Sequence, residues 1–210
     1  MTTETLQTDR HCLRAPIPEV LDVARYLDAA VSAHIAGNLG LAGALIRQAD
    51  IPSVRQWLDS IWGSKSPYVM YRAIANSPPT LPDDARVGAR MPPESVKREL
   101  IKRDGYHCRF CGIPVIRSEI RDRVRQIYPD QLQWGNSNAT QHAGFQALWL
   151  QYDHLLPHSR GGQSVVENMI ITCAACNFGR MQFTLEEVGL SDPRNRQPVT
   201  SLWDGLERFT

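Results

Sequence analysis

The chain lacks any long apolar run. No stretch of its 210 residues approaches the roughly 18 consecutive apolar residues that a membrane-spanning helix needs. The first ten residues, Met1 to Arg10, are polar and lack the apolar core of a secretory signal. From these absences we expect a cytoplasmic protein with no membrane partner.

Charge of one sign is also lacking. The chain has 23 Lys and Arg residues against 22 Asp and Glu residues, for a net charge of +1. A domain that binds nucleic acid through its overall charge typically has a pI above about 9, so overall charge indicates no class of partner here. The hydrophobic content of 42% excludes a disordered chain and suffices for one good core, or for a compact domain with a smaller helical companion.

Cysteine is scarce, yet its spacing is informative. Of five cysteines, Cys12 stands alone, and the other four form two C-x-x-C pairs, Cys108 with Cys111 and Cys173 with Cys176. Without a secretory signal this spacing favours a metal ion over disulfides, because each pair can direct two thiolates at one tetrahedral zinc about 2.3 Å away. Two thioredoxin-like redox motifs are the alternative. The interval between the pairs is far longer than the roughly 15–20 residues of a simple zinc ribbon, so other structure must lie within it.

Apolar periodicity predicts an N-terminal helical module over residues 1–65. Apolar residues recur at helical spacing between Val20 and Val31, and Gly37-Asn38 interrupts the pattern. We expect a second helix over residues 39–49 and a third that begins at Pro52 and ends at Gly63. Such a module serves packing or the docking of a protein partner.

The rest of the chain divides by composition. Residues 66–95 are rich in proline and read as a linker or strap, with one short helix over residues 68–75. Residues 96–190 form the main domain, with a long insertion over residues 115–147. In residues 191–210, Leu202, Trp203, Leu206 and Phe209 are too apolar for a free tail, so this segment is expected to pack back on the body.

Four motifs of the main domain occur in a specific order. They are RDGYHCRFCG over residues 103–112, YDHLLPHSRGG over 152–162, Glu167-Asn168, and CAACNFGR over 173–180. Together they resemble the HNH endonuclease family with a structural four-cysteine zinc site, over about residues 96–185. The resemblance implies an α+β fold, with a ββα-metal core preceded by the N-terminal helical module. Local patterns agree, since residues 148–152 and 169–172 suit strands and residues 173–185 suit a helix.

The resemblance also implies roles for site residues. Hydrolysis of a phosphodiester needs a base to deprotonate water and a cation to stabilise the developing charge. His154 fits the base because imidazole titrates near neutral pH, and Asp153 and Asn177 fit the ligands of Mg²⁺ or Mn²⁺. Asn168 matches the family's middle Asn, whose amide clamps the loop and orients His154.

Asn177 departs from the family pattern, which often has His at this position. An amide oxygen in place of imidazole favours a hard, oxygen-preferring cation over zinc or nickel. The alternative is that Asn177 merely caps the helix. His158 lies four residues after His154 but in a loop, where this spacing has no helical meaning, so an ordinary loop histidine competes with a ligand.

Basic residues supply candidates for phosphate contact. Arg160 and Arg180 stand where basic residues of the family often face phosphate; a solvated or ion-paired role is the alternative. In the insertion, residues 118–128 read as a helix on which Arg121 and Arg125, with Arg117, recur every four residues. Such a ridge suits a phosphate backbone; the alternative is a solvated helix whose arginines pair with nearby acids.

The sequence therefore predicts a metal-dependent HNH endonuclease that hydrolyses DNA, with structural Zn²⁺ and catalytic Mg²⁺ or Mn²⁺. One alternative is a non-catalytic, zinc-stabilised protein that binds nucleic acid or acts as an adaptor. Another is an RNA-directed or partner-dependent nuclease. Sequence specificity, nicking versus double-strand cutting, and oligomeric state are not predicted.

Overall fold

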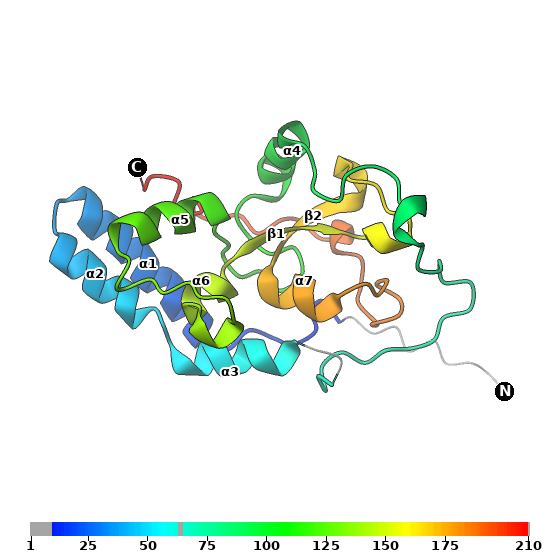
Figure 1. Ribbon diagram of the computed structural model, residues 1–210, viewed down its shortest axis with the longest axis horizontal. Helices are drawn as coiled ribbons and strands as arrows, with labels where there is room; N and C mark the ends of the chain where they lie inside the picture. Colours follow the sequence, from blue (N-terminus) through cyan, green and yellow to red (C-terminus); the bar gives the residue numbers. More distant parts are fainter. Residues whose placement is uncertain (1–9, 63–64, 210) are drawn as a thin grey trace.

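A computed structural model describes residues 10–62 and 65–209 (Figure 1). The polar segment 1–9 and Gly63, which enter the predictions above, lie outside the described residues. The structure combines helices with a small antiparallel sheet, which confirms the predicted α+β fold. None of the helices in the described part of the chain has the length and hydropathy that a transmembrane span requires.

The predicted N-terminal helices are present as α1 (Glu19–Ile35), α2 (Leu39–Gln48) and α3 (Pro52–Ile61). The side chain of Asn38 caps α2 by accepting a hydrogen bond of 3.1 Å from the backbone nitrogen of Leu41. Pro52 occupies the first turn of α3, where its missing N–H costs no hydrogen bond. These local signals explain why the helix starts follow from the sequence.

The core of the main domain is a ββα unit. Strand β1 (Leu150–His154) pairs antiparallel with β2 (Met169–Cys173), and α7 (Ala174–Arg180) follows β2 directly. The predicted strand begins two residues too early, at Leu148, but it ends on Asp153 and His154, which are the last residues of β1. The predicted helix to residue 185 is too long, because Met181 takes a positive φ of 53° that ends α7.

The remaining helices pack around this unit. They are α4 (Glu94–Asp104), which contacts β2, α5 (Ser118–Ile127) and the short α6 (Ala143–Ala147). His142 caps α6, since its Nδ1 accepts from the backbone nitrogen of Phe145 at 3.2 Å. The insertion thus contributes buried structure and is not a surface loop.

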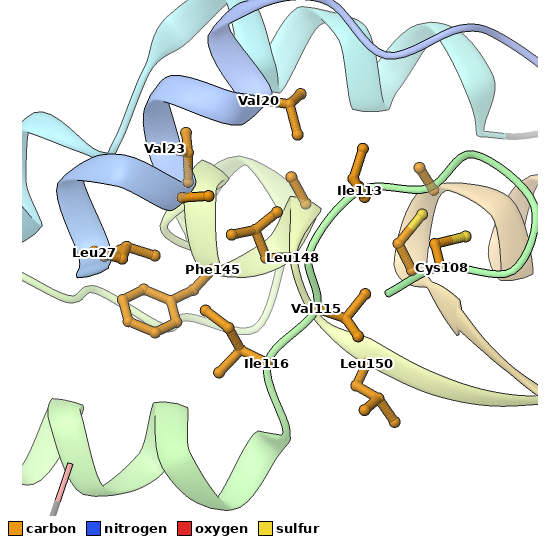
Figure 2. Close-up of a cluster of buried hydrophobic side chains, with 14 of the residues drawn as sticks. Val20, Val23, Leu27, Cys108, Ile113, Val115, Ile116, Phe145, Leu148 and Leu150 are labelled. Atoms are coloured by element: carbon orange, nitrogen blue, oxygen red, sulfur yellow. The ribbon is translucent and has the colours of Figure 1, made fainter. Parts of the chain in front are cut away.

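One hydrophobic core runs through the N-terminal helices, the insertion and the ββα unit. Figure 2 shows Val23 and Leu27 of α1 beside Phe145 and Leu148, with Ile116 and Leu150 continuing the cluster toward the sheet. All of these side chains are buried. The helical module therefore shares its core with the rest of the chain.

The proline-rich segment over residues 65–93 is an extended strap along one edge of the molecule (Figure 1). It contains the short 3-10 helix η1 (Asp83–Ala85), and the helix expected over residues 68–75 is not formed. Backbone hydrogen bonds of 2.7 Å from Arg72 to Glu187 and from Leu81 to Ser159 hold the strap against the main domain.

The C-terminal segment packs on the body. Leu206 and Phe209 are buried, and the indole nitrogen of Trp203 donates to the carbonyl of Val115 at 3.0 Å. Arg208 pairs with Asp28 of α1 at 2.6 Å. The segment therefore contacts both the insertion and the N-terminal helices, and its last described residues lie near α1 and α5 (Figure 1).

Candidate active site

The two C-x-x-C pairs meet at one point. The sulfur atoms of Cys108, Cys111, Cys173 and Cys176 all lie within 4.8 Å of one another, and the Sγ atoms of Cys111 and Cys173 are 3.6 Å apart. A tetrahedral zinc with bonds of about 2.3 Å requires sulfur atoms about 3.8 Å apart. The cluster is thus compatible with a zinc site.

Local structure explains how the cysteines converge. Cys108 and Cys111 lie on a tight turn, in which the nitrogen of Gly112 donates to the carbonyl of Cys108 at 2.9 Å and Gly112 takes a positive φ of 79°. Cys173 ends β2, and Cys176 lies in the first turn of α7. Cys12 is not in the cluster; burial, and then the charges of Cys111 and Cys108, raise its pKa to about 11.

A cleft of about 760 Å³ opens on the ββα unit. It is lined by Asp153 and His154 from β1 and by Asn177 and Arg180 from α7. The structure therefore brings the predicted base and the predicted cation ligands to one cleft. Asn168 is not part of the cleft lining within the described residues.

Asp153 is buried against Arg180. Its Oδ1 accepts from Nη2 of Arg180 at 2.6 Å and its Oδ2 from Nε at 3.3 Å. Burial raises the pKa of Asp153, although the charge of Arg180 opposes this effect. Arg180 also donates to the carbonyl of Phe183 at 2.6 Å, so its guanidinium is engaged within the protein and is not free for a phosphate.

The ring of His154 is held by Ser164. Its Nε2 lies 3.0 Å from the Oγ of Ser164, and this Oγ donates to the strap carbonyls of Ala89 at 2.7 Å and Arg90 at 3.0 Å. Since a hydroxyl has a single hydrogen, we assign the proton of the imidazole to Nε2, which leaves Nδ1 as the unprotonated atom. Burial, and then the charges of His158, Arg90 and Arg180, lower the pKa of His154 to about 4.

Asn168 ties together the loop between β1 and β2. Its Nδ2 donates to the carbonyls of Leu156 at 3.1 Å and Gln163 at 3.0 Å, and its Oδ1 accepts from the nitrogen of Leu156 at 2.9 Å. Because this loop carries Ser164, the amide of Asn168 also holds the partner of His154 in place.

Asn177 lies inside α7 and does not cap it, because the N-cap position is Cys173. The alternative role as a helix cap is therefore wrong. The amide nitrogen of Asn177 donates to Oε1 of Gln151 at 3.3 Å. His158, the loop histidine, also lines the cleft, and its Nε2 lies 3.2 Å from the carbonyl of Gly88.

The other predicted phosphate contacts lie elsewhere. Arg160 is engaged by Glu187 at 2.8 Å and by the carbonyl of Pro78 at 2.8 Å, so it braces the strap. Arg121 stacks on Trp134, with its Cζ 4.0 Å from the ring centroid, and pairs with Asp122 at 2.9 Å. Arg125 is exposed on α5. In the described part of the chain, the cleft lining includes none of these arginines.

The sequence interpretation missed three basic residues that line the cleft, Arg86, Arg90 and Lys97. Arg117, which was named with the basic ridge, also lines it. Arg90 is exposed and forms no ion pair among residues 10–62 and 65–209. The sequence did contain one signal for these residues, two arginines, Arg86 and Arg90, in a segment without an apolar period. This signal could not place them at the site, because only folding brings the strap to the β1–β2 loop.

Comparison with known proteins agrees with this geometry. Residues 145–180, which run from α6 through β1, β2 and α7, match the family model described as HNH endonuclease. No curated protein and no solved structure gives a significant match. The chain therefore carries an HNH domain, and the presence of this domain supports the assignment to a nuclease-type family.

Proposed function

We propose that this protein is a metal-dependent endonuclease that hydrolyses DNA phosphodiester bonds in the cleft of its HNH domain. The observation that carries the proposal is the convergence of His154, Asp153 and Asn177 on one cleft within the segment that matches the family. A base and hard oxygen ligands in one cleft are what hydrolysis of a phosphodiester by water requires.

His154 acts as the general base. With Nε2 donating to Ser164, the free Nδ1 accepts the proton of the attacking water. The depressed pKa keeps the ring neutral near pH 7, which is the form that can accept a proton. Asn168 and Ser164 orient the ring. Ser164, in the β1–β2 loop, contacts Nε2 of His154, and Asn168 fixes that loop.

Asp153 and Asn177 would hold the catalytic cation. Both line the cleft, and donation from the Asn177 nitrogen to Gln151 leaves the amide oxygen for a metal. A carboxylate and an amide oxygen suit Mg²⁺ or Mn²⁺, which complete their coordination with water and phosphate oxygens. When bound, the cation stabilises the charge that develops on the phosphate and the leaving oxygen.

The four-cysteine cluster would hold Zn²⁺ as a structural ion, because its sulfur atoms are spaced for tetrahedral coordination. Phosphate contact falls to the basic residues of the cleft, Arg90 first, in place of Arg160, Arg180, Arg121 and Arg125. The cytoplasmic location and a protein partner at the N-terminal helices stay predictions.

The test is cleavage of plasmid and linear DNA by the purified chain with Mg²⁺ or Mn²⁺, beside a His154→Ala control. A general base contributes about 10²- to 10⁴-fold to the rate, so the variant should lose at least that much activity. An RNA substrate of the same sequence is run in parallel, because the same chemistry cuts either backbone. Intact DNA with both proteins across several cations would overturn the proposal.

A second candidate is a non-catalytic, zinc-stabilised protein that binds nucleic acid. The ion pair between Asp153 and Arg180 favours it, since this carboxylate already has a buried counter-charge. This candidate predicts binding of nucleic acid without cleavage, and equal binding by the chain and His154→Ala.

A further inference from the structure

Apolar side chains are exposed on the cleft. Phe178 and Met181, at the end of α7, are each 38% exposed, and Met91 of the strap is 62% exposed. All three line the cleft that contains His154. Scattered exposed apolar residues are ordinary, but a group that shares one cleft marks a surface for a ligand.

The ring of Phe178 is held in a frame of aromatic side chains. Its centroid lies 5.8 Å from that of Trp149, at 75°, and 5.9 Å from that of Trp62, at 66°. Trp149 is in turn braced by Trp134 at 5.8 Å and by the guanidinium of Arg121 at 5.1 Å. A ring that is fixed yet exposed loses little conformational entropy when a planar ligand stacks on it.

Basic side chains line the same cleft as Phe178. Arg86, Lys97 and Arg117 line the cleft but are paired with Asp83, Glu94 and Glu207 respectively. The acidic lining residues are Glu119 and Asp153, and Arg180 neutralises Asp153. Arg90, exposed and without an ion pair in the described chain, is the cation most available to an incoming phosphate.

We propose that the cleft binds an unpaired nucleic-acid strand, with a base stacked on Phe178 and a phosphate held by Arg90. The inference rests on the proposed function, because it names the form of the substrate for that site. In a duplex each base face is covered by its neighbours, so Phe178 can stack only on a base that has left the stack. Aromatic platforms beside a basic groove are how proteins bind single strands.

The size of the cleft agrees with this substrate. Its volume of about 760 Å³ lies within the roughly 300–1,000 Å³ of pockets that enclose compact ligands. The structure therefore suits a short run of unstacked nucleotides.

The test is equilibrium binding of the full chain without added divalent cation, at one fixed salt concentration. The probes are a fluorescent DNA strand, the RNA strand of the same sequence, and the DNA duplex. We expect the DNA strand to bind about tenfold more tightly than the duplex. Tighter binding of RNA than of DNA would support the same inference and move the substrate to unpaired RNA.

Phe178→Ala should weaken single-strand binding by about 5- to 150-fold, the factor that corresponds to about 1–3 kcal/mol of stacking. Phe178→Trp keeps a stacking surface and should retain binding. Tyr71→Ala is the matched control, since Tyr71 is exposed and stacks on Phe183 at 5.0 Å but is not among the residues that line the cleft. Melting temperatures of the variants establish that each is folded.

Duplex binding as tight as single-strand binding would overturn the inference, and so would equal behaviour of Phe178→Ala and Tyr71→Ala. Because binding is measured without metal, the result is independent of cleavage. A chain that loses single-strand binding with Phe178→Ala but cuts nothing contradicts the proposed function alone. A chain that cuts duplex DNA equally well with and without Phe178 contradicts this inference alone.

Discussion

Nε2 of His154 lies 3.0 Å from Oγ of Ser164, and the hydrogen of that hydroxyl is directed to carbonyls of the strap. The β1–β2 loop and a segment more than seventy residues upstream therefore meet at the ring of His154. Ser164 is therefore a positioning residue. Its hydroxyl accepts the hydrogen of Nε2 and so leaves Nδ1 of the imidazole free to accept a proton.

Ser164→Ala should lower the rate of cleavage while leaving nucleic-acid binding unchanged. The loss of one hydrogen bond, worth about 1 kcal/mol, corresponds to about a fivefold decrease in single-turnover rate with Mg²⁺. Ser164→Thr retains the hydroxyl and should restore most of the rate. If Ser164→Ala and the unmodified chain react equally fast, the hydrogen bond has no positioning role.

Arg90→Ala should weaken binding of nucleic acid and reduce its dependence on salt. Removal of one phosphate contact lowers the slope of log affinity against log salt by about one. Arg125→Ala is the control, since Arg125 is exposed on α5 and is not among the cleft residues. A larger loss with Arg125→Ala would instead support the predicted basic ridge on the insertion.

Arg180→Leu should destabilise the fold. It leaves the buried carboxylate of Asp153 without its counter-charge, and breaking a buried ion pair costs about 3–5 kcal/mol. Arg194→Ala provides the comparison, because Arg194 is exposed and its pair with the half-buried Asp192 should contribute no more than about 1 kcal/mol. Urea unfolding measures both, and similar midpoints for the two variants would contradict the assignment.

Cys173→Ser should abolish the structural metal site. Elemental analysis should find about one zinc per unmodified chain and much less in the variant, together with loss of folded structure. Cys12→Ser should keep its zinc, because Cys12 is not in the cluster.

Mild EDTA treatment should remove cleavage activity before it removes zinc. Loss of both together would argue against two distinct metal sites.

Phe209→Ala should destabilise the protein by about 3–5 kcal/mol, since a large aromatic side chain leaves a cavity. Phe209 is 1% exposed, and its ring centroid lies 4.6 Å from that of His34 of α1. Leu202→Ala, at a residue of the same segment that is fully exposed, should change stability by less than about 0.5 kcal/mol. Equal melting temperatures would show that the C-terminal segment does not secure the fold.

Local patterns predicted those parts of the structure that depend on neighbours in the chain. The spacing of the cysteines, the break at Gly37-Asn38, the helix start at Pro52 and the apolar period of α1 each depend on a few neighbouring residues. The predicted boundaries of β1 and α7 were less accurate. The start of β1 depends on its pairing with β2, which is distant in the chain. The end of α7 depends on the positive φ of Met181, for which the sequence has no clear signal.

By itself the sequence determined that the two thiol pairs and the residues Asp153, His154, Asn168 and Asn177 occur in the order of an HNH domain. Only the tertiary structure decided the partner of each charged side chain. Arg180 and Arg160, predicted at the phosphate, pair with Asp153 and Glu187, while Arg90 comes to the cleft from the strap. The reason is physical: the energy of a charge depends on its burial and on its nearest opposite charge, and both are set by contacts between distant parts of the chain.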